Sequence, residues 1–242
     1  MLNIPNKYKI GNNGKRLNLK TFITADLTTV EKKRLRDNLK KVTLTHQISG
    51  ENIPSLINDE YNCAVIIFLD IELADIKHKY FIGRIIQNMI KPYCVIRFYD
   101  SLHQAFCFAH KRLSKTEQNE IVVDDIVVTN PFGLHLADCG LFTEHLEFSA
   151  LKNTVNKRDL YLEAMTKTYL CDNNLIFSDA QKLFESKVWF NSSQSLNLLR
   201  ELRKLQAFKY DKTKAVMSKE KVILNTQIKK QINIIKKNYL GA

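Results

Sequence analysis

The sequence predicts a mixed α/β fold, α+β in detail, in which a strand–helix–strand unit and an antiparallel meander precede an α-helical C-terminal region that ends in a long amphipathic helix. Residues 63–73 contain an apolar, β-branched run that is too short for a helix and typical of a strand covered on both faces. Residues 79–90 have apolar side chains at helical spacing, and residues 94–99 form a second apolar strand. These three segments make the strand–helix–strand unit.

The segment before this unit predicts a helix and one strand. Thr28 and Glu31 have the spacing of a capping box, which begins a helix that continues to Leu39. Residues 41–48 alternate apolar and polar side chains, as a half-buried strand does. Residues 49–60 are rich in turn-forming residues and predict a loop.

Two further strands are expected after the unit, over residues 105–113 and 120–129. Short loops join them to the preceding strand, so we expect an antiparallel meander beside the parallel pair. A mixed sheet of this kind argues against a doubly wound nucleotide-binding fold.

The C-terminal region predicts helices over residues 153–165, 178–190 and 193–207, followed by a long helix over residues 214–240. The long helix has a coiled-coil-like seam, which we define as Leu224, Ile228, Ile232 and Ile235. This seam is expected either to close a helical hairpin that turns at residues 210–213, or to bind another protein or a second copy of the chain.

The chain is accordingly divided into a basic N-terminal arm (1–25), a mixed α/β domain (26–132) and a helical C-terminal region with a terminal hairpin or short coiled coil (133–242). Its net charge of +12 is uneven, because residues 1–41 and 191–242 are strongly basic while the middle is acidic. The basic ends predict polyanion binding, docking onto the acidic middle, or simple solvation of lysine-rich faces.

Composition and cysteine usage predict a cytoplasmic protein. No apolar run is long enough to span a bilayer, and the first residues lack a secretory signal, so we expect no membrane association. Five scattered cysteines, three of them in expected strands, are typical of buried thiols in a reducing compartment.

Familiar catalytic motifs are absent from the sequence. There is no glycine-rich phosphate loop, no G-x-S-x-G elbow and no Cys-x-x-Cys pair. These absences argue against an NTPase, a Rossmann dehydrogenase, an α/β-hydrolase and a zinc ribbon. His135, Cys139 and His145 could meet a zinc ion, but a loop–helix junction is the better interpretation and no metal site is assigned.

One constellation has the residue types of a nuclease centre. Asp70 and Glu72 share a face of the central strand, and restriction-type nucleases use such carboxylates to hold Mg²⁺. The lysine that follows in such centres is missing, because position 74 is Ala; Asp59 or Glu60 could supply a further acid. The alternative is that both carboxylates are solvated near the end of the strand. Mg²⁺ is expected only under the nuclease hypothesis, and otherwise no cofactor is expected.

Basic residues in the meander and in the last helix are candidates for nucleic-acid binding. Together with Tyr99 and His110, the meander residues could contact phosphates and stack on bases, although strand edges also use such residues as protection. The candidates are Arg97, Lys111, Arg112, Lys229 and Lys230.

Several short motifs in order resemble the uncharacterised bacterial family DUF4391 over nearly the whole chain. They are residues 17–22 (LNLKTF), 71–73 (IEL), 90–94 (IKPYC), 109–112 (AHKR), 159–161 (DLY) and 219–230 (KEKVILNTQIKK). The family that it resembles tends to have a proline at the position of Cys94, and many of its members have a lysine at the position of Ala74.

The resemblance implies a context among helicases, methyltransferases and restriction or phage-defence proteins, but no activity. We therefore expect a non-enzymatic accessory or adaptor subunit of a bacterial DNA-processing, restriction or phage-defence complex, with a helicase, a methyltransferase or another defence subunit as its partner and DNA as a further ligand. The alternatives are a divergent Mg²⁺-dependent nuclease and a helical oligomerisation module.

Overall fold

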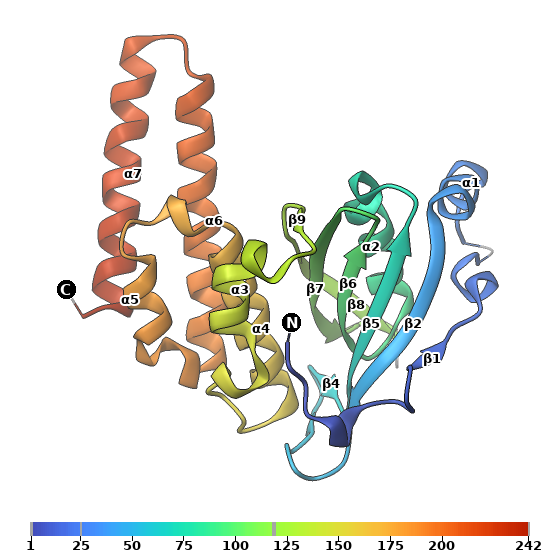
Figure 1. The fold of residues 1–242 in the computed structure, drawn as a ribbon. Coiled ribbons are helices and arrows are strands. Elements are labelled where there is room, and N and C mark those ends of the chain that lie inside the picture. The colour runs from blue at the N-terminus through green and yellow to red at the C-terminus, as the bar shows by residue number, and fades with distance from the viewer. Residues whose placement is uncertain (1, 25, 118–119, 242) are drawn as a thin grey trace.

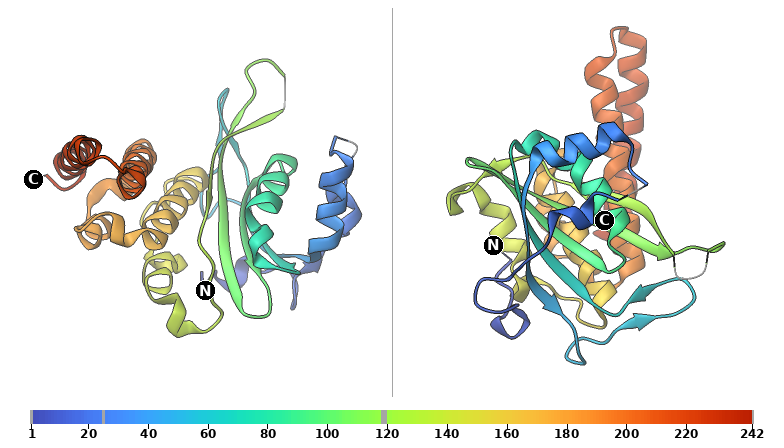
Figure 2. Two further views of the ribbon diagram at one scale, coloured as in Figure 1. Left: turned by 90° about the horizontal axis from the view of Figure 1, so that it is seen from above. Right: turned by 90° about the vertical axis from the view of Figure 1, so that its right-hand side faces the viewer.

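The computed structural model describes residues 2–24, 26–117 and 120–241. A central sheet separates two helical layers (Figures 1 and 2). Helices α1 (Thr29–Asn38) and α2 (Lys79–Met89) cover one face, and the helices that follow the sheet in sequence cover the other. The expected mixed α/β fold, with a long C-terminal helix, is confirmed.

The main sheet has the order β1-β2-β5-β6-β7-β8, and the short β9 pairs with β7. Its strands are β1 (Lys15–Arg16), β2 (Leu39–Ile48), β5 (Ile66–Leu73), β6 (Tyr93–Tyr99), β7 (His103–Leu113), β8 (Ile121–Val128) and β9 (Phe132–Gly133). Strands β5 and β6 are parallel because α2 connects them as a crossover, whereas the other pairs are antiparallel.

A separate hairpin precedes the central strand. It consists of β3 (Leu56–Ile57) and β4 (Asn62–Cys63), inside a segment expected to be a loop that leads into a strand. Cys63 therefore belongs to the small hairpin, and the central strand begins at Ile66 rather than at residue 63.

The layer formed by α1 and α2 contains the expected capping box and a close contact between helix and sheet. The capping box forms, because the Glu31 amide donates to Thr28 Oγ1 at 3.3 Å and the Thr28 amide donates to Glu31 Oε2 at 3.0 Å. Helix α2 lies close to the sheet at Gly83, where a Cβ atom would be 2.9 Å from Cys107 Sγ. Glycine at this position allows the close approach of helix and strand.

The opposite layer contains α3 (Gly140–Leu146), α4 (Lys157–Asp172), α5 (Ala180–Glu185), α6 (Ser192–Lys214) and α7 (Ser218–Tyr239). One hydrophobic core joins this layer to the sheet and includes Phe108, Tyr161, Trp189 and Ile235. The Tyr161 hydroxyl also donates to the Cys94 carbonyl at 2.9 Å and accepts from the Ala109 amide at 2.7 Å. The helices are thus packed and hydrogen-bonded onto the strands.

Several helix boundaries differ from the expected ones. Helix α4 starts at Lys157, not at residue 153, because Asn156 caps it by accepting from the Asp159 amide. The helix expected over residues 178–190 is broken at Ser186, which caps a separate turn at Lys187–Phe190. Helix α6 continues to Lys214, since residues 210–213 contain no glycine or proline.

Helices α6 and α7 form an antiparallel hairpin that extends away from the rest of the molecule (Figure 1). The turn between them comprises residues 215–217, not residues 210–213. Near the base of the hairpin, Gln231 Nε2 donates to the Glu201 carbonyl at 3.1 Å, so a polar contact joins the two helices there.

The five cysteines are all buried and free, as their usage predicts. In the described part of the chain, none of the helices combines the length and apolar character needed to cross a membrane.

Candidate functional site

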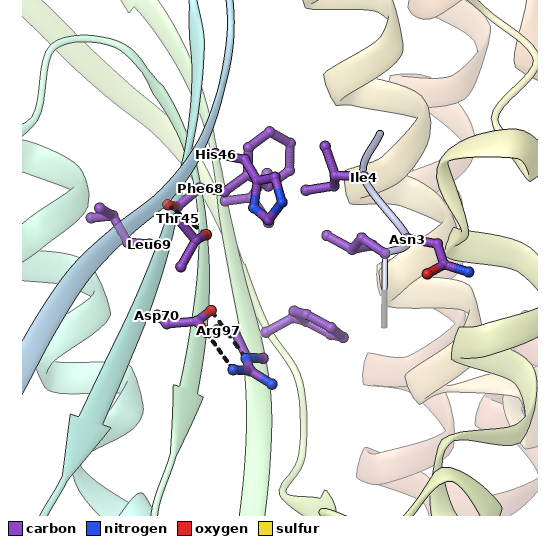
Figure 3. Close-up of a pocket in the computed structure, with 11 residues that line it drawn as sticks. Asn3, Ile4, Thr45, His46, Phe68, Leu69, Asp70 and Arg97 are labelled. Carbon is purple, nitrogen blue, oxygen red and sulfur yellow. Dashed lines mark hydrogen bonds and ion pairs between the residues drawn. The ribbon is translucent and has the colours of Figure 1, made fainter. Parts of the chain in front are cut away.

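A cavity of about 290 Å³ lies over the middle of the parallel strands β5 and β6, on the face toward the C-terminal helices (Figure 3). Sheet residues form one wall, and residues 2–4 of the N-terminal arm form the other. The lining residues are Leu2, Asn3, Ile4, Thr45, His46, Phe68, Leu69, Asp70, Val95, Arg97 and Phe106.

An ion pair between Asp70 and Arg97 is the main polar feature of the cavity (Figure 3). The two residues are register partners on β5 and β6. Arg97 Nε donates to Asp70 Oδ1 at 3.0 Å, and Arg97 Nη2 donates to Asp70 Oδ2. Both carboxylate oxygens of Asp70 are therefore occupied by one guanidinium group, a strong and directional arrangement.

The strand registers bring additional basic residues to the same face of the sheet. Lys41 is the register partner of Glu72, and Arg16 is the partner of Thr43, which in turn lies opposite Asp70. Lys9 forms an isolated bridge with His46. Paired residues of neighbouring strands project to the same side, so Lys9, Arg16 and Lys41 surround the cavity face. We refer to Lys9, Arg16, Lys41 and Arg97 as the basic face.

Lys41 supplies a lysine to the face on which restriction-type nucleases have one, at the position of Ala74 in this chain. It comes from the neighbouring strand and lies on the same face as Asp70 and Glu72. In the sequence, the alternation of Lys41 and Thr43 within residues 41–48 indicated that both lie on the same side of a strand. The neighbouring strand that pairs with them could not be identified from that segment alone.

His46 contributes an imidazole to the cavity wall, where its ring meets Phe68 edge-on at 6.2 Å. Burial lowers the pKa of His46; the nearby Asp70 carboxylate raises it, and the Lys9 ammonium group lowers it further. The imidazole is therefore neutral at pH 7, and it offers a ring surface and one acceptor nitrogen to the cavity.

The five candidate nucleic-acid-binding residues do not form one surface. Lys111 is 1% exposed; burial lowers its pKa to about 8, and its ammonium group donates to the carbonyls of Ile90 and Pro92. Arg112 Nε is held by Asp124 Oδ1 at 2.9 Å. Lys229 and Lys230 are exposed on α7, which is separated from the sheet by α4 and α6. Only Arg97 reaches the cavity.

The seam of α7 faces the protein's own core. Ile235 is fully buried, and Ile228 and Ile232 pack against the same core, while Leu224 is half-buried. Intramolecular packing therefore occupies most of the seam that was predicted to bind a partner.

The additional acidic and metal candidates do not join the cavity. The Glu60 carbonyl accepts from the Leu113 amide on β7. On the same strand, Phe106 is level with Asp70, and Leu113 lies seven residues further along. Glu60 is therefore roughly 23 Å from Asp70 along the strand direction. Cys139 Sγ donates to the His135 carbonyl, and the His145 ring stacks on Phe184 at 3.7 Å. Among the described residues, no group of three or more His, Cys, Asp or Glu side chains is placed to hold a metal ion.

Comparison with known proteins identifies the family. A family model described as a domain of unknown function (DUF4391) matches residues 2–233, nearly the whole chain. The chain belongs to the DUF4391 family. No match was found among curated proteins or among solved structures.

This DUF4391 chain contains a second cluster of titratable residues, at the far end of β7. His110 is buried, and its Nε2 accepts from Arg158 Nη2 at 3.2 Å. The Arg158 guanidinium group stacks on the Tyr61 ring at 3.6 Å. Burial, together with the positive charge of Arg158, lowers the pKa of His110 to about 4, although Asp124 and Asp125 oppose this shift.

We expect stability to fall as the pH decreases from about 6.5 to about 4. In that range the unfolded chain binds a proton at His110 that the folded chain does not, so protonation favours unfolding by up to about 3 kcal/mol. Urea denaturation at pH 7 and pH 4.5 measures the loss, which should be smaller in His110→Gln. An equal loss in both proteins would assign the acid sensitivity to other groups.

Proposed function

We propose that this DUF4391 protein is a cytoplasmic, non-enzymatic adaptor subunit of a bacterial DNA-processing, restriction or phage-defence complex. Its partner would be a helicase, a methyltransferase or another subunit of the complex. The end of the α6–α7 hairpin, which we define as residues 209–224, would bind this partner. The observation that supports the proposal is the exposed apolar surface at the end of the hairpin.

Five large apolar side chains are between 51% and 88% exposed within this short segment. They are Tyr210, Val216, Met217, Val222 and Ile223. Exposed apolar residues scattered singly need no explanation, but a cluster on a projecting element is typical of an interaction site. A concavity of about 410 Å³ beside Ile223 and Leu224 adds a place for a partner side chain.

Charge indicates the chemistry of the partner. Residues 209–224 contain five lysines and two acidic residues, so the apolar side chains stand in a basic surrounding. A complementary surface would have an apolar centre with an acidic rim. This charge pattern also disfavours a second copy of the same hairpin end, because like charges would meet.

The cavity supports the non-enzymatic part of the proposal. A Mg²⁺ ion at Asp70 would have to displace the Arg97 guanidinium group from both carboxylate oxygens. Glu72 and Lys41 are close in register, which keeps a divergent nuclease as the second candidate. The Asp70–Arg97 pair favours the adaptor, because the positive charge that a metal would supply is already present.

Affinity capture from the native host tests the adaptor proposal. The tagged wild-type chain should retain a helicase, methyltransferase or other nucleic-acid-processing subunit, and Ile223→Asp should lose it at least tenfold, because a charge replaces an apolar contact at the centre of the interface. Quantitative mass spectrometry of the captured proteins measures the ratio.

Leu175→Asp is the matched control, since Leu175 is 92% exposed on the body of the protein and the same change is made there. It should leave capture unchanged. Equal capture by Ile223→Asp, or capture of no nucleic-acid-processing protein by the wild type, would contradict the proposal. Light scattering of the purified chain should give the mass of a monomer; a dimer that Ile223→Asp converts to monomer would favour self-association.

A further inference from the structure

We infer that the cavity and the basic face bind single-stranded nucleic acid, with one unpaired base in the cavity and the phosphates on Lys9, Arg16, Lys41 and Arg97. This inference rests on the DNA-processing context of the proposed function, and it assigns to the protein a ligand class and a place of contact. It locates the contact on the sheet face rather than on the lysines of α7.

The walls of the cavity suit a flat, partly apolar group. Phe68 faces it from β5, His46 adds a neutral ring, and Ile4 closes it from the arm (Figure 3). Phe106 and Leu2 also line it. The volume of about 290 Å³ is at the lower end of the range for ligand pockets, which is suitable for one base. Aromatic walls bind bases with little sequence preference, because every base has a stacking face.

The charge of the surrounding face favours an anion. The four basic residues exceed the two acidic ones, Asp70 and Glu72, on this part of the sheet. Within the described residues, Lys9, Arg16 and Lys41 have no ion-pair partner, and Lys9 and Arg16 are exposed. Unpaired cations beside an aromatic cavity match the two requirements of a single-strand site, which are phosphate attraction and base stacking.

Asp70 orients the Arg97 side chain for this role. It binds Nε and Nη2 of the guanidinium group and leaves Nη1 without a hydrogen bond to any described residue. The Tyr99 ring lies 5.4 Å from the same guanidinium group and supports its position. A pre-oriented guanidinium edge binds a phosphate with less loss of side-chain entropy than a free arginine.

The geometry selects a single strand over a duplex. Arg16, Thr43, Asp70 and Arg97 form one row across four neighbouring strands, so about 14 Å separates Arg16 from Arg97. A phosphate backbone that follows this row would bring a base to the cavity. The base can enter only if it is unstacked, which a single strand allows at little cost and a duplex does not.

Fluorescence anisotropy with a labelled 12-nucleotide oligothymidine tests the inference on the full chain. We expect binding that weakens with salt, with a slope of about −2 to −3 in log K against log salt, as three or four phosphate contacts would give. An oligonucleotide of the same length with abasic sites should bind at least fivefold more weakly, because stacking is lost. The matching duplex should also bind more weakly.

Arg16→Ala and Arg97→Met should each weaken binding severalfold and reduce the salt slope by about 0.7. Lys229→Ala is the matched control, an exposed basic residue on α7, and should change the affinity less than twofold. Arg16 is exposed and its replacement should not affect folding, so the test does not depend on Arg97→Met alone.

Equal affinity for the abasic oligonucleotide or the duplex would overturn the assignment of a base to the cavity. Equal losses in Lys229→Ala and Arg16→Ala would overturn the basic face as the contact surface. If no oligonucleotide binds while the hairpin end still captures its partner, this inference fails and the adaptor proposal stands. If oligonucleotides bind as expected while no partner is captured, the adaptor proposal fails and the single-strand site stands.

Discussion

Replacing Glu163 with alanine is expected to lower the free energy of unfolding by about 4 kcal/mol. The carboxylate is fully buried in α4 and pairs with the Lys167 ammonium group at 2.6 Å. It also accepts from the backbone amides of Lys152 and Asn153. The variant leaves a buried ammonium group and two buried amides without their acceptor, and such losses cost more than the pair itself contributes.

The pKa of Lys167 supports this reasoning. Burial lowers it, and the Glu163 carboxylate raises it again. Without Glu163, the contacts that stabilise this charge among the described residues are the Ala150 carbonyl and the Trp189 ring. Urea denaturation at pH 7 measures the change in unfolding free energy.

Two control variants separate charge from volume. Glu163→Gln keeps the size of the side chain and should lose less stability than Glu163→Ala. Lys204→Ala removes the exposed Lys204–Glu201 pair and should cost less than about 1 kcal/mol. A loss below about 1 kcal/mol in Glu163→Ala would show that water or neighbouring groups replace the carboxylate.

Replacing Lys157 with methionine is expected to lower the free energy of unfolding by about 3 kcal/mol. The Lys157 ammonium group is buried at the start of α4 and donates to the Gly50 carbonyl, the Ile53 carbonyl and Ser55 Oγ, at 2.7 to 3.0 Å. Methionine fills a similar volume but leaves these acceptors unsatisfied. This lysine joins the helical region to the loop after β2, which is over 100 residues away in sequence.

Urea denaturation measures the stability of Lys157→Met, and hydrogen exchange should show faster exchange in residues 50–57. Lys187→Met is the control, because Lys187 is exposed and the same change there should stay within about 0.5 kcal/mol. Unchanged exchange in the loop would show that the ammonium group does not hold it in place.

The sequence indicated individual residues of the candidate site, but it did not indicate which of them lie together. Asp70, Glu72 and Arg97 were each predicted to be functional, Asp70 and Glu72 because they alternate on one apolar strand. Their assigned roles differed, however, with the carboxylates assigned to a metal and the arginine to nucleic acid. Asp70 and Arg97 are register partners, and that pairing depends on the crossover between β5 and β6. The basic residues Lys9, Arg16 and Lys41 were missed because they reach this face only through long-range pairing.

The burial of individual lysine residues could not be predicted from the local sequence either. Lys111, Lys157 and Lys167 are buried, while Lys229 and Lys230 are exposed, and nothing in their immediate sequence distinguishes the two groups. A lysine is buried where carbonyl or carboxylate groups from another segment accept its hydrogen bonds.

By itself, the sequence determined the fold class, the strand–helix–strand unit, the capping box of α1 and the long terminal helix, because apolar periodicity and local hydrogen bonding depend on near neighbours. The tertiary structure alone decided where α6 turns, which cations pair, and which residues meet at the cavity. Those features depend on contacts between segments that are far apart in the chain, and their free energy comes from burial and charge compensation that no local pattern records.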